Sequence, residues 1–67
     1  MHTITANGKK FSIGDYLTLD RFLSQMNVDK RWVVVELNGE PLNRDQITVT
    51  PLRDGDKLEI VIPIAGG

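Results

Sequence analysis

The stretch DGDKLEIVIP (residues 54–63) decides how this chain folds. Asp54-Gly55 is a turn signal, because glycine readily adopts the positive φ angles that tight turns need. The next six residues, KLEIVI, alternate as a β-strand does. Pro63 has no N–H group and therefore ends a hydrogen-bonded ladder. We predict a strand over residues 57–62 with one buried apolar face, made of Leu58, Ile60 and Ile62.

The beginning of the chain predicts a β-hairpin. HTITA (residues 2–6) and KKFSI (residues 9–13) both alternate between apolar and polar side chains. Asn7-Gly8 lies between them and is a strong hairpin signal, because both residues tolerate positive φ. We expect the first strand of this hairpin to lie beside the last strand of the chain, since the intervening segment is long enough for a crossover.

One helix is predicted over TLDRFLSQM (residues 18–26). Thr18 suits the N-cap position, and Asp20 lies in the first turn, where the helix dipole favours an acid. Asn27 is a plausible end. The apolar residues recur at i, i+3, i+4 and i+7 and form one stripe, which we expect to face the core: Leu19, Phe22, Leu23 and Met26.

The segment between this helix and the last strand gives weaker signals of secondary structure. RWVVVEL (residues 31–37) is rich in β-branched residues and predicts a strand, turned by Asn38-Gly39. EPLNRDQITVTPL (residues 40–52) is expected to be irregular. Its prolines, Pro41 and Pro51, confine any strand there to short or edge pieces.

This order of elements predicts an α+β fold of the β-grasp, or ubiquitin-like, kind. The sheet is mixed and has four to five strands, with one helix packed on one face and the other face open to solvent. We assign residues 1–63 to this domain and residues 64–67 to a flexible C-terminal tail that ends in Gly-Gly.

Composition excludes most enzymatic functions. The chain has 67 residues, which is one small domain without room for a deep catalytic cleft. It has one histidine, His2, and no cysteine, so neither a zinc site nor a nucleophile–base pair is predicted. We expect no catalytic residue, no metal site and no enzymatic activity of the chain itself.

Charge and hydropathy also restrict the partners. The net charge is −1, with acids and bases interspersed, which argues against nucleic-acid binding. No apolar run reaches the roughly 18 residues of a membrane span, and the start is not a signal segment. We therefore expect no membrane association and a cytoplasmic location.

The tail IPIAGG (residues 62–67) is the one segment suited to chemistry. Glycine has no Cβ and lets a backbone pass through a narrow channel. Neither Gly66 nor Gly67 carries a side chain that would block attack at the terminal carboxyl carbon. Adenylation would activate that carboxylate, and sulfur transfer would convert it to a thiocarboxylate, so a chain without cysteine can still carry sulfur. The plainer alternative is a frayed and idle end.

The residues resemble the ThiS sulfur carrier family of thiamine biosynthesis, whose members are ubiquitin-like. The resemblance covers the whole chain and rests on Thr18-Leu19, ELNGE (residues 36–40), Arg44, TPLRDGDKLEIV (residues 50–61) and Gly66-Gly67. Two positions depart from the family pattern: Asn43 stands where a proline is common before the arginine, and Ala65 precedes the two glycines.

The resemblance implies a sulfur carrier and protein co-substrate. Gly67 would be adenylated by an E1-like adenylyltransferase (ThiF-like) that uses ATP and Mg²⁺, with no cofactor bound stably to the carrier. Sulfur would come from a cysteine desulfurase or a persulfide relay and pass to thiazole synthase (ThiG-like). Ile64, Ala65 and Gly66 would thread into the partner.

Other functions stay open beside this one. A sister carrier for molybdopterin or another thio-cofactor, a covalent modifier of other proteins, and a β-grasp interaction module all fit the same pattern. Docking residues are expected on the open sheet face near the tail. Val61 is the first candidate, because it alternates with the residues expected in the core. Trp32 is the second, although WVVV does not alternate and leaves its direction ambiguous.

Overall fold

The N-terminal hairpin forms as predicted. In the computed structural model, which describes residues 1–63, β1 (His2–Ala6) pairs antiparallel with β2 (Lys9–Ile13). The turn residues Asn7 and Gly8 have φ angles of 52° and 81°. These left-handed angles suit asparagine and glycine, so the turn signal is confirmed.

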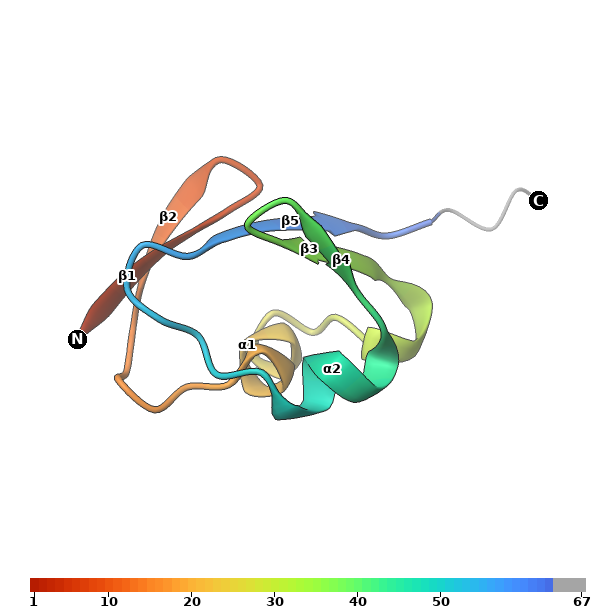
Figure 1. Cartoon of the computed structure of the whole chain (residues 1–67), viewed down its shortest axis with the longest axis horizontal. Coiled ribbons are helices and arrows are strands. Elements are labelled where there is room, and N and C mark those ends of the chain that lie inside the picture. Colours follow the sequence, from red (N-terminus) through yellow and green to blue (C-terminus); the bar gives the residue numbers. More distant parts are fainter. Residues whose placement is uncertain (64–67) are drawn as a thin grey trace.

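The last strand is the central strand of the sheet, which confirms the main fold prediction. β5 (Lys57–Val61) lies between β1 and β3 (Val34–Leu37), and the strand order is β2-β1-β5-β3-β4. It runs parallel to β1 and antiparallel to β3. The sheet is therefore mixed and has five strands, in the β-grasp arrangement, with both helices on one side of it (Figure 1).

The predicted helix is α1 (Leu19–Gln25). The Thr18 hydroxyl accepts a hydrogen bond from the backbone N–H of Arg21 at 3.2 Å, as an N-cap does. Asn27 follows the helix with φ of 60°, which confirms the predicted end. The expectation for Met26 was wrong. It is the C-cap residue and is exposed, because the helix ends before its side chain can join the apolar stripe.

A second helix, α2 (Arg44–Val49), lies in the segment expected to be irregular. A capping box begins it: the Asn43 side chain accepts from the N–H of Gln46 at 2.9 Å, and the Gln46 side chain accepts from the N–H of Asn43 at 2.8 Å. Ile47 anchors it in the core. The prediction of one helix is therefore corrected to two. The short edge strand is confirmed as β4 (Glu40–Leu42).

The strand predicted over residues 31–37 was too long. Residues Lys30–Trp32 form a 3₁₀ turn, η1, and β3 begins only at Val34. The Asp29 carboxylate caps this turn by accepting the N–H of Arg31 at 2.9 Å, which bends the chain before the β-branched residues can extend it. Trp32 therefore does not belong to the sheet.

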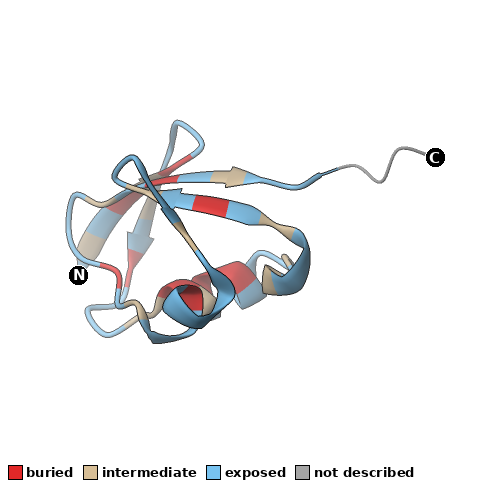
Figure 2. Ribbon diagram, turned by 45° about the vertical axis from the view of Figure 1, so that its right-hand side comes forward, coloured by how far each residue is buried: buried red, intermediate tan, exposed pale blue. Residues whose placement is uncertain are grey.

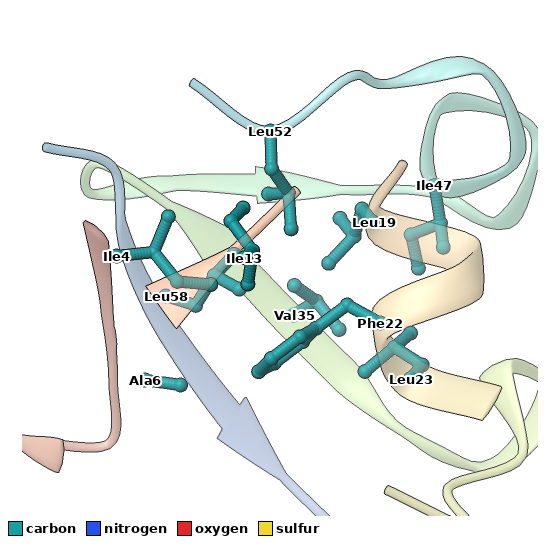
Figure 3. Packing of buried hydrophobic residues seen from close by; sticks show 10 residues of the cluster. All are labelled: Ile4, Ala6, Ile13, Leu19, Phe22, Leu23, Val35, Ile47, Leu52 and Leu58. Carbon is teal, nitrogen blue, oxygen red and sulfur yellow. The ribbon is translucent and has the colours of Figure 1, made fainter. Parts of the chain in front are cut away.

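The core lies between the sheet and the helix layer. Side chains of α1 meet those of the strands there (Figure 3), and Phe11 and Phe22 pack edge to face with ring centroids 5.4 Å apart. The buried residues are Ile4, Ala6, Ile13, Leu19, Phe22, Leu23, Val35, Ile47, Leu52 and Leu58.

Burial along β5 falls off toward the tail, which corrects one expectation. Leu58 is fully buried, but Ile60 is only partly buried and Ile62 is exposed. β1 pairs with β5 only as far as Leu58, opposite Ala6, so Ile60 has a full strand on one side alone. Ile62 lies beyond the last residue of β5. Figure 2 shows the end of β5 that leads to Pro63 in the colours of intermediate and exposed residues.

Candidate functional site

An exposed apolar surface surrounds the point where the chain leaves the sheet. Val61 is the last residue of β5, and its partner in β3 is Val34. Their side chains lie on the open face, since the next pair, Val35 and Ile60, faces the core. Val61, Val34 and Trp32 are 58%, 50% and 66% exposed. We call Trp32, Val34, Val61 and Pro63 the tail-exit patch.

A shallow cleft joins this patch to the end of the described chain. It has a volume of about 340 Å³ and is lined by Arg31, Trp32, Val33, Val34 and Pro63. The structure thus brings together Trp32 and Val61, the two predicted docking residues, through Val34. A contiguous exposed apolar patch is a feature that often marks a contact site for another protein.

Val34 was missed by the sequence reasoning. The run WVVV gives no alternation, so it does not show which valines face outward. The register of β3 against β5 supplies that information, because Val34 lies opposite Val61 and must share its face. A prediction of strand pairing, with the outward Val61 as the reference, would have found it.

The cation beside the cleft is already paired. The Arg31 guanidinium donates to both carboxylate oxygens of Asp29, with the shortest distance 2.7 Å, from Nη2 to Oδ2. These hydrogen bonds from Arg31 lower the pKa of Asp29 to about 2 and raise the pKa of Arg31. Arg31 therefore offers the cleft its hydrocarbon stem and little free charge.

Side-chain amides hold the strand that carries the tail. The Asn7 oxygen accepts from the N–H of Ile60 at 2.7 Å, and its amide nitrogen donates to the carbonyl of Ile60 at 2.9 Å. On the other side of β5, the Asn38 oxygen accepts from the N–H of Lys57 at 2.9 Å. The two hydrogen bonds from Asn7 take the place of the ladder that β1 no longer supplies beyond Leu58. They keep the last residues of β5 attached to the domain.

The two acids of the D-G-D turn have structural contacts. The Asp54 carboxylate accepts from the N–H of Thr3 at 2.7 Å, and the Asp56 carboxylate accepts from the N–H of Arg53 at 2.7 Å. These two contacts tie the start of β5 to β1 and close the turn on itself.

The remaining predicted site residues, Ile64, Ala65, Gly66 and Gly67, lie outside the described residues. Within residues 1–63, no three side chains of histidine, cysteine, aspartate or glutamate come together as metal ligands. No helix in that range has the length and apolar character needed to cross a membrane.

Comparisons with known proteins show which family the chain belongs to. The ThiS family model matches residues 2–67. A thiazole synthase from Paramagnetospirillum magneticum is 36% identical over 64 residues, which cover 96% of this chain but only 20% of that protein. The sulfur carrier protein ThiS from Thermus thermophilus is 40% identical over 50 residues, covering 75% of this chain and 78% of that protein.

The fold has a solved counterpart. The crystal structure of the thiamine biosynthesis protein ThiS from Geobacter metallireducens superposes with a TM-score of 0.80 at 35% identity, covering 97% of this chain and 99% of that one. The chain thus spans about a fifth of the length of its thiazole synthase relative and nearly the whole of its structural relative. Since the family model covers almost every residue, the chain belongs to the ThiS family.

Proposed function

We propose that this chain is a sulfur carrier of thiamine biosynthesis and acts as a protein co-substrate, with no enzymatic activity of its own. The observation that carries the proposal is the match along nearly the whole chain to a solved ThiS protein. The relative from Thermus thermophilus, named a sulfur carrier protein, supports the same function. The cytoplasmic location expected from the sequence is part of the proposal.

The reacting group in this proposal is the carboxylate of Gly67. An E1-like adenylyltransferase would bind ATP and Mg²⁺, and the carboxylate oxygen would attack the α-phosphorus, releasing pyrophosphate. The terminal sulfur of a persulfide on a cysteine desulfurase or relay protein would then displace AMP and form an acyl disulfide. A second thiol would attack the persulfide-bearing sulfur, release the thiocarboxylate and end in a disulfide with the first thiol. The chain has no cysteine, so any thiol needed to free sulfur from a persulfide must come from a partner.

The fold supports this role through the point at which the chain leaves the sheet. β3 pairs with β5 up to Val61, the Asn7 side chain holds the other edge of β5 as far as Ile60, and Pro63 cannot continue the ladder. Four residues beyond Pro63 reach at most about 13–14 Å when extended. A partner that takes Gly67 into its active site must therefore lie close to the tail-exit patch. We propose Val61, Trp32 and Val34 as docking residues for that partner, with Ile64, Ala65 and Gly66 threading into its channel.

The acceptor of the sulfur is proposed to be a thiazole synthase. In Paramagnetospirillum magneticum, a protein with that name contains a segment 36% identical to this chain. A carrier segment in the same polypeptide as a synthase indicates that the two work together. This relationship favours the thiazole pathway over a sister pathway to molybdopterin.

The test uses two changes at Gly67. One variant lacks Gly67, and the other carries one added residue after it. Both should keep the wild-type circular dichroism and melting midpoint, because the tail follows Pro63 and the core lies elsewhere. Both should fail to support ATP–pyrophosphate exchange by the adenylyltransferase of the source organism, because reacting atoms must meet within about 3–3.5 Å.

The wild type, given ATP and a sulfur donor, should gain the mass of one sulfur in place of one oxygen, mapped to Gly67. It should also rescue a thiazole-requiring strain. Exchange supported equally by the truncated chain would overturn the proposal. Rescue of a molybdopterin-requiring strain instead would move the carrier to the sister pathway, and isopeptide adducts would identify a modifier.

A further inference from the structure

The hydrogen bonds of β1 show which way the backbone groups of β2 point. In β1, the N–H of Thr5 donates to the carbonyl of Asp56 at 2.9 Å, and the carbonyl of Thr3 accepts from the N–H of Gly55 at 2.8 Å. Both threonines therefore direct their backbone groups toward the chain at the start of β5. The residues opposite them in β2 do not exchange backbone hydrogen bonds with them, because an antiparallel ladder alternates between bonded and non-bonded pairs.

The outer edge of β2 therefore presents unpaired backbone groups. The residues opposite Thr5 and Thr3 are Lys10 and Ser12, and their N–H and C=O groups point away from β1. β2 is an outermost strand of the sheet, so these four groups have no strand partner within residues 1–63. Such an edge can pair with an extended segment of another chain. The opposite edge is less suited to pairing, because β4 has three residues and one of them is Pro41.

The side chains along the outer edge of β2 are basic. Lys9 and Lys10 are both exposed, and neither belongs to an ion pair within the described residues. Lysines on an edge strand discourage pairing with a second copy, because the two edges carry the same charge. They suit a segment with acidic side chains. Adjacent residues of a strand point to opposite faces, so the two lysines meet acids on both faces of an added strand.

A hollow continues from the end of β2. It has a volume of about 630 Å³, and its lining includes Ile13 of β2, Tyr16 and Arg21. Tyr16 is 95% exposed, and Arg21 forms no ion pair within residues 1–63. The acid in the lining, Asp15, is already paired with the amino group of Met1. Aromatic rings and arginines are enriched in protein interfaces, so the hollow extends the contact surface that the edge begins.

We propose that the outer edge of β2 binds an extended segment of another protein, which adds to the sheet as a further strand and carries acidic side chains opposite Lys9 and Lys10. The backbone groups of Lys10 and Ser12 form the new ladder, and the hollow takes an apolar side chain at one end of the segment. β1 lies between β2 and β5, so this edge faces away from the tail-exit patch (Figure 1). A partner bound there leaves that patch uncovered, and the contact does not depend on the proposed function.

The test uses synthetic peptides as the added strand. The first is roughly eight residues long, within the usual range for a strand. It alternates threonine and valine, with two adjacent glutamates opposite Lys9 and Lys10 in an antiparallel register and a leucine at the end beside the hollow. A second peptide has glutamine in place of both glutamates. A third carries N-methyl groups on the amides that face β2, so that these cannot donate. Each peptide is titrated into the isotope-labelled chain, and the backbone amide signals are followed by NMR at about 50 mM and about 500 mM salt.

The acidic peptide should shift the amide signals of Lys10 and Ser12 and slow the hydrogen exchange of both, because their N–H groups become donors in the new ladder. The signals of β4 should not move. The glutamine peptide should bind about fivefold more weakly at low salt, and the difference should shrink at high salt, since exposed ion pairs are weak and are screened. The N-methylated peptide should not bind.

Variants of the chain separate the charges from the backbone. The double variant Lys9→Gln, Lys10→Gln should bind the acidic peptide about fivefold more weakly. The matched control is Lys57→Gln, which changes an exposed lysine of the central strand and should bind like the wild type. Ser12→Pro removes an outward N–H while the ladder to β1 does not use it, so it should abolish binding at an unchanged melting midpoint. If Ser12→Pro does not fold, the N-methylated peptide tests the same ladder from the partner's side.

Three results would overturn the proposal. The first is the absence of any shift along β2 up to about 1 mM acidic peptide, a concentration at which even weak contacts are seen. The second is equal binding of the acidic and glutamine peptides at both salt concentrations. The third is a dimer of the wild type in analytical ultracentrifugation that Ser12→Pro abolishes, which would assign the edge to a second copy.

Discussion

Replacing the large apolar side chains of β5 by alanine, one at a time, is the sharpest test of the fold. Leu58, Ile60 and Ile62 all alternate on one side of the strand, yet they differ in burial from complete to slight. We expect Leu58→Ala to destabilise the domain most, Ile60→Ala less, and Ile62→Ala hardly at all. The three changes remove similar side chains, so the differences between them report burial alone.

The magnitudes follow from that burial. Leu58 is 0% exposed, and a fully buried leucine truncated to alanine costs about 3–5 kcal/mol. Ile60 is partly buried, so its truncation costs about half as much. Ile62 is 57% exposed and lies outside the ladder, so its truncation costs under about 0.5 kcal/mol. For a domain of 67 residues the whole stability is about 3–10 kcal/mol.

Far-ultraviolet circular dichroism during heating and in urea measures these differences. Each kcal/mol shifts the melting midpoint of such a domain by about 4–8 °C, so Leu58→Ala should melt about 12–40 °C lower, or be unfolded outright. Leu58→Val is a milder variant that keeps the comparison measurable. Trp32 fluorescence is a poor probe, because that side chain is 66% exposed in the folded chain. If Ile62→Ala lowered the free energy of unfolding as much as Leu58→Ala does, the geometry described for β5 would be refuted.

Three further predictions concern the helix cap, the docking patch and acid stability. Asn43→Ala should remove the capping box of α2 and cost about 1 kcal/mol in urea unfolding, while Asn43→Asp should restore most of it. Val61→Asp should melt like the wild type but bind the adenylyltransferase more weakly, because it buries an unpaired charge; equal affinity would remove Val61 from the docking patch. The pKa of Asp29 is about 2 when folded, below its unfolded value of 3.8, so its stabilising effect is complete above about pH 4 and is lost toward pH 2. Asp29→Asn should therefore flatten the dependence of urea midpoints on pH between about 4 and 2, and an unchanged slope would contradict the role of Arg31.

The parts of the fold that follow from local chemistry could be predicted. Asn7-Gly8 and Asn38-Gly39 adopt the left-handed angles that only a few residue types tolerate, so each marks its turn directly. Thr18 marks the start of α1 as an N-cap residue, and the spacing of the apolar residues after it marks the helix itself. The central strand ends at Val61, two residues before Pro63, which could not have continued its ladder.

The parts that depend on distant contacts were missed. α2 has six residues, too few for a periodic stripe, and its signal was the capping box between Asn43 and Gln46. The burial of Leu58 and the exposure of Ile62 depend on where β1 stops pairing with β5, which alternation does not reveal. Trp32 leaves the sheet because Asp29 caps a turn ahead of it. Gly67 was chosen through its chemistry and the family resemblance, and its role stays a prediction.

The amide of Asn7 makes this protein susceptible to chemical ageing. Asn7 is followed by Gly8, and the lack of a side chain on glycine leaves its nitrogen unhindered for attack on the asparagine amide, the first step of deamidation. Conversion to aspartate would replace the amide nitrogen by an oxygen 2.9 Å from the carbonyl oxygen of Ile60. A bond would become a repulsion between two acceptors, and β5 would loosen at the end that leads to Pro63. In stored protein the end of β5 would then become less firmly attached, although the gene is unchanged.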